Sequence, residues 1–443
     1  MVLDFGARLR HGQFEICQLA MLFIGESQNS NRRNRNMMTM EELRGVAEKQ
    51  RRAEMRREAG LPRRMAVDER MLETHALVLT GVRRCGKSTL MTQRIREGGE
   101  GWFYLKFDAP QLVAFELQDS ARLDGVVEES GAKRLYFDEI HEVEGWELYV
   151  LEKLDEGYRV CVTGSNASLL KGERAGKLTG RHVSLELFPF SYAEYLAFTG
   201  KEKGRTSVED YLKTGGFPRY VQTGEETHLA ELFDDIVQRD VVLRHGIRDR
   251  GAVERLAWYL AENPGCRFSA TRMLEALGVK NASTVTQWCD WLEDAYLFFF
   301  VPRHSDSARA RLVNPRKVYC VDTGMLDVVS TRLVFNDALR FENLVFLALR
   351  RAFREICYFD EGAGECDFVA ARRHRVEMVV QACVEFGGDN ARRELRGVRA
   401  AMARFGLKEG WIVTLGQREE YAVEEGLVRV VPFEDFAEQL EKN

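Results

Sequence analysis

The sequence predicts an α/β protein: a parallel sheet with a phosphate-binding loop, then a helical unit in winged-helix order, then a second α/β unit. Three observations predict this. Short β-type runs alternate with helical stretches in the first half, and the motif GxxxxGK[ST] follows one such run. After residue 250, three helical stretches lead into a β-rich run. A chain of 443 residues is long enough for two or three such units.

Composition and charge exclude several classes of protein. Hydrophobic residues make up 45% of the chain, charged residues of both signs make up 30%, and the net charge is -5, which describes a soluble globular protein. The nine cysteines form no CxxC pair, so we expect a reducing, cytoplasmic setting rather than a disulfide framework or a zinc ribbon. No apolar run approaches the roughly 18 residues needed to cross a bilayer, so neither a membrane partner nor a signal peptide is expected.

Residues 1–64 are expected to form a tail and a basic helix. The polar run Ser27–Asn36 precedes Met37, Met38 and Met40. Two interpretations stay open for the first 36 residues: translated leader sequence upstream of the true start, or a mobile tail of the natural protein. The stretch from Glu41 to about Arg64 is rich in Ala, Glu, Lys and Arg, which predicts an exposed helix packed loosely on the next unit of the chain.

Residues 65–204 carry the pattern of a parallel sheet covered on both faces. The expected strands are Ala76–Thr80, Trp102–Phe107, Arg134–Phe137 and Tyr158–Thr163. The segment Leu185–Pro189 leads into a helix that Ser191 and Glu194 should begin as a capping box. We place the end of this unit near Gly200–Arg205.

The second half of the chain divides into two further units. In residues 205–315 the sequence first predicts helices that break at Gly215–Pro218. Three helices and a β-rich run follow, which is winged-helix order. These four segments are Val253–Leu260, Ser269–Leu277, Ser283–Leu292 and Ala295–Pro302. Residues 316–443 predict a strand at Lys317–Val321 and then an α/β unit. Its expected elements are a helix at Leu339–Phe353, strands at Ile356–Phe359, Cys366–Ala370 and Val376–Cys383, a helix at Ala391–Phe405 and a last strand at Trp411–Leu415.

Residues Gly81–Ser88 fit GxxxxGK[ST] between an apolar strand and a helix-forming run. In this geometry backbone amides and a helix N-terminus face the phosphates, Lys87 reaches the β- and γ-phosphates, and the Ser88 hydroxyl ligates Mg2+. ATP and Mg2+ are therefore the expected cofactors. The expected nucleotide-binding residues are Gly81, Arg83, Arg84, Cys85, Gly86, Lys87, Ser88 and Thr89.

Two carboxylates, Asp138 and Glu139, end a buried β-type run about fifty residues after this loop. Asp138 is expected to hold Mg2+ through water, together with Ser88. Glu139 is expected to orient and deprotonate the attacking water. A base for water favours hydrolysis over transfer of the phosphoryl group to a small molecule.

Three further residues are candidates for a role in catalysis, and each also has a purely structural interpretation. Ser165 and Asn166 follow the run Tyr158–Thr163, where a polar side chain either senses the γ-phosphate or caps a helix that begins at Ala167. Arg181 either neutralises transition-state charge, in its own subunit or in a neighbour, or forms a surface salt bridge. An oligomer is required only if Arg181 acts on a neighbour.

Ten segments in this order carry a resemblance to a known family. They are Gly81–Ser88, Tyr104–Asp108, Leu135–Ile140, Thr163–Asn166, Gly180-Arg181, Pro189–Leu196, Gly215–Pro218, Arg239-Asp240, Phe341–Val345 and Gly364–Val369. On these residues the chain resembles prokaryotic predicted ATPases of the AAA+ type. Those proteins join a P-loop domain, a winged helix and a C-terminal domain of unknown function similar to restriction endonucleases. The resemblance implies ATP binding and slow hydrolysis.

The C-terminal unit departs from the nuclease pattern that the resemblance implies. A nuclease core of that kind holds magnesium with carboxylates and activates water with a lysine. Glu342 and Asp367 match, but the strand that should carry Glu-x-Lys reads Gln381-Ala382-Cys383. We therefore expect a degenerate unit and an ATP-hydrolysing switch or motor that acts with DNA or a protein. An ATP-regulated DNA nuclease and a nucleotide-gated scaffold with negligible hydrolysis are the alternatives.

The helix Ser283–Leu292 is the segment that would read DNA in a winged helix. It carries Asp290 and is followed by Glu293, while basic residues stand only before the helix and after the β-rich run. This charge distribution disfavours DNA binding. The competing interpretation is a packing module that closes over the nucleotide.

Overall fold

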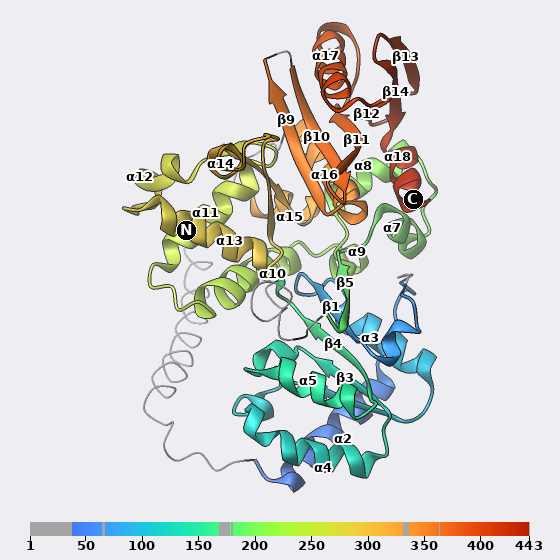
Figure 1. Cartoon of the computed structure of the whole chain (residues 1–443), viewed down its shortest axis with the longest axis vertical. Helices are drawn as coiled ribbons and strands as arrows, with labels where there is room; N and C mark the ends of the chain where they lie inside the picture. The colour runs from blue at the N-terminus through green and yellow to red at the C-terminus, as the bar shows by residue number, and fades with distance from the viewer. Residues whose placement is uncertain are drawn as a thin grey trace, which may run out of the picture.

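The computed structural model describes residues 38–63, 67–167, 178, 180–330, 336–362 and 364–442. The expected leader or tail over residues 1–36, and the body of the helix expected from Ala167, lie outside these ranges. Figure 1 shows the P-loop sheet in blue and green at the bottom, the helical middle unit in yellow at the side, and the C-terminal sheet in orange and red at the top.

Five parallel strands form the first sheet in the order β2-β3-β4-β1-β5. The strands are β1 Ala76–Gly81, β2 Trp102–Lys106, β3 Arg134–Asp138, β4 Arg159–Gly164 and β5 His182–Leu187. The four strands expected from the β-type runs are thus confirmed to within one residue at each end. Strand β1 is buried along its whole length because β4 and β5 flank it and helices cover both faces.

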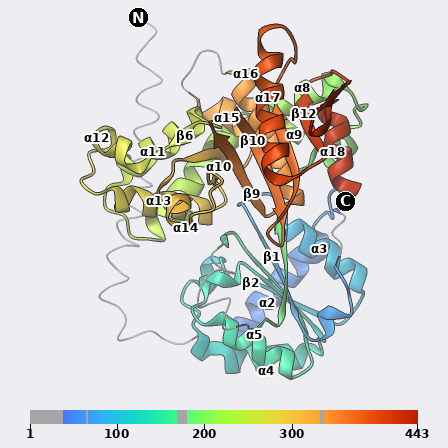
Figure 2. The same cartoon turned by 45° about the horizontal axis from the view of Figure 1, so that its top comes forward.

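Helices cover both faces of this sheet (Figure 2). Helices α2 Met40–Arg56, α4 Ser120–Ser130 and α5 Trp146–Asp155 share one hydrophobic cluster with Val78 of β1. Helix α3 Lys87–Gly98 packs with Leu77 and Leu79, because successive residues of a strand face opposite sides. The expectation that the first helix packs loosely is wrong: Leu43 of α2 is 1% exposed and belongs to the cluster that covers the sheet.

The middle of the chain begins with helices that break where the sequence predicts a break. Helix α7 Tyr192–Thr199 starts with the expected capping box: the Ser191 hydroxyl accepts the Glu194 N–H, and the Glu194 carboxylate accepts the Ser191 N–H. Helices α8 Arg205–Thr214, α9 Pro218–Thr223 and α10 Thr227–Asp235 follow, and α10 runs into a π-helix, η6 Ile236–Leu243. A side chain at Gly215 would collide with Asp322, whose carboxylate accepts the Gly216 N–H at 2.7 Å.

The rest of the middle unit contains helices and a small antiparallel sheet in the order β6-β8-β7. Its helices are α11 Arg250–Glu262, α12 Leu274–Leu277, which follows the 3-10 helix η7 Ala270–Met273, and α13 Ala282–Asp294. Its strands are β6 Arg267–Phe268, β7 Phe298–Val301 and β8 Arg316–Cys320. Short helices α14 Ala308–Val313 and α15 Thr323–Val329 flank β8.

The C-terminal unit is a six-stranded mixed sheet in the order β13-β14-β12-β11-β10-β9. It runs as helix α16 Asp337–Ala352, three antiparallel strands, helix α17 Gly388–Phe405 and a fourth strand parallel to the third. These strands are β9 Glu355–Glu361, β10 Gly364–Arg372, β11 Arg375–Ala382 and β12 Glu409–Thr414.

The expectation that the strand near Trp411–Leu415 is the last one is wrong. Two further strands, β13 Glu419–Val423 and β14 Gly426–Pro432, and helix α18 Phe433–Lys442 follow it. Strand β13 is a polar edge strand with no buried residue, so it carries no hydrophobic run to reveal it.

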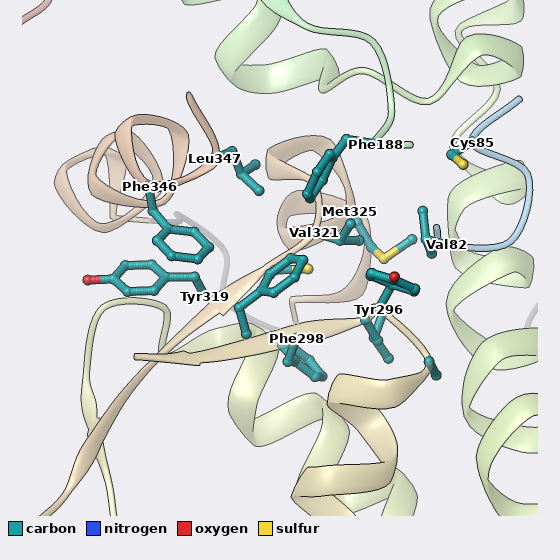
Figure 3. Packing of buried hydrophobic residues seen from close by; sticks show 14 of the residues in the cluster. Val82, Cys85, Phe188, Tyr296, Phe298, Tyr319, Val321, Met325, Phe346 and Leu347 are labelled. Atoms are coloured by element: carbon teal, nitrogen blue, oxygen red, sulfur yellow. The ribbon is translucent and has the colours of Figure 1, made fainter. Parts of the chain in front are cut away.

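A buried hydrophobic cluster joins the P-loop to the two later units. Figure 3 shows Val82 and Cys85 of the loop near Phe188 and Met325, with Tyr296 beside them. The Tyr296 hydroxyl donates a hydrogen bond to Oγ1 of Thr80, the residue before Gly81, at 2.9 Å. The backbone of Tyr296 is left-handed, with φ of 60°. The P-loop therefore packs against the middle unit.

Among the described ranges, no helix is both long enough and apolar enough to span a membrane. The eight cysteines within those ranges are all free thiols.

Candidate nucleotide site

The loop between β1 and α3 is built for close backbone approach. Gly81 has φ of 145°, and a side chain there would meet the Leu187 carbonyl oxygen at 2.0 Å. Gly86 has φ of 108° and stands at the N-cap of α3, where it brings no side-chain acceptor for the first helical amides. The N-terminus of α3 therefore keeps amide donors for an anionic ligand.

Lys87, the first residue of α3, is 4% exposed. Its ammonium donates hydrogen bonds to the carbonyl oxygens of Gly81 and Val82, at 3.0 and 3.1 Å. It also lies 3.9 Å from Oε1 of Glu139. The structure thus brings together the lysine and the second carboxylate that the sequence predicts for one site.

Asp138, at the end of β3, is fully buried and held by two hydroxyl groups. Thr163 Oγ1 donates to Asp138 Oδ1 at 2.5 Å and accepts the Glu139 N–H at 2.9 Å. The Tyr104 hydroxyl donates to Asp138 Oδ2 at 3.0 Å. Burial, and then the charge of Asp138, raises the pKa of Tyr104, so this hydroxyl remains a donor at neutral pH. The two hydroxyls fix the direction of the carboxylate.

Glu139 has a left-handed backbone, with φ of 53°, an uncommon and costly conformation for this residue. Its Oε2 accepts the Ser165 N–H at 3.2 Å and lies 3.3 Å from Nδ1 of His141. Ser165 and Asn166 are both buried. Ser165 therefore contacts Glu139 through its backbone, while its own hydroxyl has no hydrogen-bond partner in the described part of the chain.

Arg181 is not brought to the P-loop. Its guanidinium pairs with Asp155 at 2.5 Å and donates to the Thr74 carbonyl at 3.3 Å. Its own carbonyl accepts the N–H of Ala76, the first residue of β1. Arg181 therefore lies beside the first residue of β1, whereas Gly81 is the last of its six residues. At 3.3 Å per residue the two backbones are roughly 16 Å apart. This placement does not fit a role on the nucleotide of its own subunit.

The two arginines of the loop contact the middle unit. Arg83 donates two hydrogen bonds to Asp240 in η6, at 2.9 and 2.6 Å, and Arg84 donates one to Asp235 of α10 at 3.1 Å. The hydrogen bond with Asp240 raises the pKa of Arg83, so the guanidinium stays charged. The π-helix that carries Asp240 is a rare form that occurs frequently at functional sites.

Arg63 is a site residue that no sequence signal revealed. Its side chain is 6% exposed and makes two 2.7 Å hydrogen bonds to Glu194. It also donates to the carbonyls of Cys85 and Phe188, both at 3.0 Å. Burial alone would raise the pKa of Glu194, but Arg63 brings it below its usual value. Arg63 therefore holds the P-loop through its hydrogen bond to the Cys85 carbonyl. It does so although it lies within residues 1–64, which the sequence analysis placed outside the P-loop unit.

Comparisons with known proteins agree with this geometry. An AAA domain matches residues 73–196, and a domain of unknown function matches residues 205–333. An uncharacterised protein of Haemophilus influenzae is 31% identical over 335 residues, which is 70% of this chain and 82% of that protein. The chain belongs to the family of this Haemophilus protein. An uncharacterised protein of Methanocaldococcus jannaschii is similar as well, with 28% identity over 398 residues, which is 83% of this chain and 89% of that protein.

Among solved structures, the S. cerevisiae Hsp104-ADP complex matches 58% of this chain and 41% of its own chain, with 17% identity and a TM-score of 0.27. The AAA match and the parallel sheet that carries the P-loop support a nucleotide-binding domain of the AAA+ type.

Proposed function

We propose that this protein hydrolyses ATP in a Mg2+-dependent manner and works as a molecular switch. One observation carries the proposal: Lys87 and Glu139 meet 3.9 Å apart at the P-loop, beside the fully buried Asp138. This donor set fits a nucleotide with its cation, because a helix N-terminus, an ammonium and a carboxylate lie together. Lys87 and the amides before α3 would hold the phosphates, and Ser88 and Asp138 would hold Mg2+. The cation would supply charge stabilisation for the phosphoryl group.

Glu139 is the residue that would orient and deprotonate the attacking water. The Thr163 hydroxyl holds its N–H and the Ser165 N–H holds its carboxylate, so both ends of the residue are fixed. A fixed carboxylate supports hydrolysis, because positioning contributes much of the rate of phosphoryl transfer.

The contacts of the three cations of the loop support the switch. Lys87 binds loop carbonyls, Arg83 binds Asp240, and Arg84 binds Asp235. Phosphate oxygens compete for all three, since charge-assisted hydrogen bonds to phosphate are as strong as those to carboxylate. Nucleotide binding would therefore draw the arginines away from α10 and η6 and change how the middle unit is held.

The exposed face of α13 argues for packing rather than DNA reading in the middle unit. The order of helices and strands after residue 250 supports a winged helix. Ser283, Thr286, Gln287 and Asp290 are exposed on α13, whereas Trp288 and Leu292 are buried. This face offers no positive charge to a phosphate backbone, so we infer that the unit is a packing module that closes on the nucleotide side.

Two variants test the assignment. Glu139→Gln should keep ATP binding and lose hydrolysis by about a hundredfold or more, as expected on removal of a water-positioning base. Lys87→Ala should lose nucleotide binding. Unchanged turnover in Glu139→Gln would reject the role of Glu139. Phosphate release by the wild type, with and without DNA, separates the switch from a scaffold with negligible hydrolysis and shows whether DNA is a partner.

A further inference from the structure

A buried lysine lies among three carboxylates where the middle unit meets the C-terminal unit. Lys317 comes from β8 of the middle unit and is 4% exposed. Its ammonium lies 2.8 Å from Asp367 Oδ1, 3.1 Å from Glu342 Oε1 and 3.2 Å from Glu365 Oε1. The carboxylates come from β10 and α16, so two units of the chain meet at this point.

Neighbouring groups fix each of the two innermost carboxylates. Glu342 Oε1 accepts the Tyr319 hydroxyl at 2.7 Å. Asp367 Oδ2 accepts the Ala382 N–H at 3.1 Å, and the Gln381 side chain accepts the Asp367 N–H at 3.1 Å. The two carboxylates are therefore held in place by a network of hydrogen bonds, and they are not a loose cluster of charges.

The ammonium remains charged inside this network. Burial alone would lower the pKa of Lys317, but Asp367 and Glu342 outweigh it and raise the pKa well above its ordinary value. An ammonium donates three hydrogen bonds, and three carboxylate oxygens lie around this one. Lys317 is thus the cation on which the carboxylates converge.

Oxygen atoms that converge in this way are also what a divalent cation takes from a protein. Here the point of convergence is filled, and the part of the chain that the structure describes holds no group of three or more His, Cys, Asp or Glu side chains placed to bind a metal ion. Strand β11 lacks the lysine that the nuclease pattern requires beside Glu342 and Asp367; a lysine arrives instead from β8.

We propose that Lys317 is a built-in substitute for a divalent cation: its ammonium occupies the convergence point, closes the site to metal ions and ties β8 to α16 and β10. A second pair of contacts supports the tie, because Arg267 of β6 lies 2.9 Å from both Asp360 and Glu365. Contacts at two points therefore join the middle unit to the C-terminal unit. This proposal does not depend on ATP hydrolysis.

Removal of the ammonium tests the proposal directly. Lys317→Ala leaves three carboxylates around a small void, where they can move inward onto an ion. In nucleotide-free protein, millimolar Mn2+ should raise the melting temperature of Lys317→Ala by about 2–5 °C. Lys317→Met, which fills the void without a charge, should give no such rise. Lys317→Ala combined with Asp367→Asn should also give none.

The wild type supplies a test that needs no folded Lys317 variant. Mn2+ should leave the difference in melting temperature between wild type and Asp367→Asn constant, because the wild-type site is closed to the ion. A difference that grows with Mn2+ would show that Asp367 binds the ion in the wild type and would overturn the proposal. A folded Lys317→Ala without any response to Mn2+ would overturn it as well.

Discussion

Arg83 of the P-loop and Asp240 of the π-helix η6 are joined by two hydrogen bonds, although they lie 157 residues apart in the chain. A paired guanidinium and carboxylate in this two-point geometry is among the stronger polar contacts in proteins. It fastens the loop that would hold phosphates to an element of the middle unit. Both nucleotide binding and stability should respond when such contacts are removed.

Asp240→Asn should tighten nucleotide binding. Loss of the negative charge weakens the hold on Arg83 and frees it for phosphate. Charge-assisted hydrogen bonds are worth about 1.5–3 kcal/mol, and the amide keeps a neutral one worth about 0.5–1.5 kcal/mol. The net loss is about 1–1.5 kcal/mol, so we expect the Kd for a fluorescent ATP analogue to fall by up to about tenfold. Asp235→Asn is the matched control with a smaller effect, because its partner Arg84 is 43% exposed. Weaker binding in Asp240→Asn would instead mean that Asp240 positions Arg83 for the nucleotide.

Thr163→Val should lower hydrolysis more than it lowers nucleotide binding. The substitution keeps the shape of the side chain but removes the hydroxyl that serves both Asp138 and Glu139. We expect kcat to fall by about 10–100-fold, with an increased requirement for Mg2+. Tyr104→Phe, which removes only the second hydroxyl on Asp138, should show a milder loss. Equal effects of the two variants would contradict the double role of Thr163.

Arg63→Ala should destabilise the protein and loosen the P-loop. It leaves Glu194 without its charge partner and two carbonyls without a donor, a loss of about 3–5 kcal/mol for a broken buried pair. Urea unfolding and ATP-analogue binding would report the two effects. Arg52→Ala is the control, since Arg52 forms an exposed pair with Glu48 on α2 and should change stability by less than about 1 kcal/mol.

Arg181→Ala should leave ATP turnover within about twofold of the wild type. Its guanidinium lies at the far end of β1 and pairs with Asp155. If Arg181 acts on a neighbouring subunit, Arg181→Ala would lose activity, and a mixture with Glu139→Gln would recover part of it. Recovery on mixing would therefore contradict the expected result and reveal an oligomer.

Stability should fall as pH rises from about 5 to 7.5, and Glu342→Gln should reduce this fall. Burial, and then Asp367, raises the pKa of Glu342 to about 7 in the folded state. A carboxyl with a raised pKa binds its proton more tightly when folded, so its contribution is present at low pH and is lost as pH passes 7.

The pH effect has a second source and a limit. Burial raises the pKa of Asp322 to about 6, so some slope remains in Glu342→Gln. One proton changes the free energy of unfolding by at most about 1.4 kcal/mol per pH unit. Urea unfolding at several pH values measures the slope, and Glu424→Gln, whose side chain is 90% exposed, is the control. An identical slope in wild type and Glu342→Gln would refute the prediction.

Local patterns predicted most of the fold. The strands of the first sheet show as apolar runs because both faces of that sheet are covered, and the capping box at Ser191 is a local signal. The polar edge strand β13 and the packing of α2 were missed, since the first has no buried residue and the second buries only a few positions. A local sequence pattern indicates which side chains are buried, but it does not indicate which elements they pack against.

The candidate site was predictable to the same extent. Lys87, Asp138 and Glu139 stand in fixed positions relative to their strands, so the motif places them together. Arg63, Asp240 and Lys317 reach their partners from 22 to 157 residues away, and no local signal shows which residues they contact. Arg181 directly precedes β5, and β5 pairs with β1 in parallel. Only this pairing shows that Arg181 lies at the end of the sheet away from the P-loop.

The hydrogen bond from Tyr296 to Thr80 has a practical consequence for dissecting this protein. A fragment that ends near residue 204 would contain the whole AAA match, yet it would leave the Thr80 hydroxyl buried without its donor and expose the apolar side chains that surround Val82 and Phe188. Such a fragment should aggregate rather than fold. The smallest autonomous piece that carries a working phosphate loop therefore extends through the middle unit, past Tyr296.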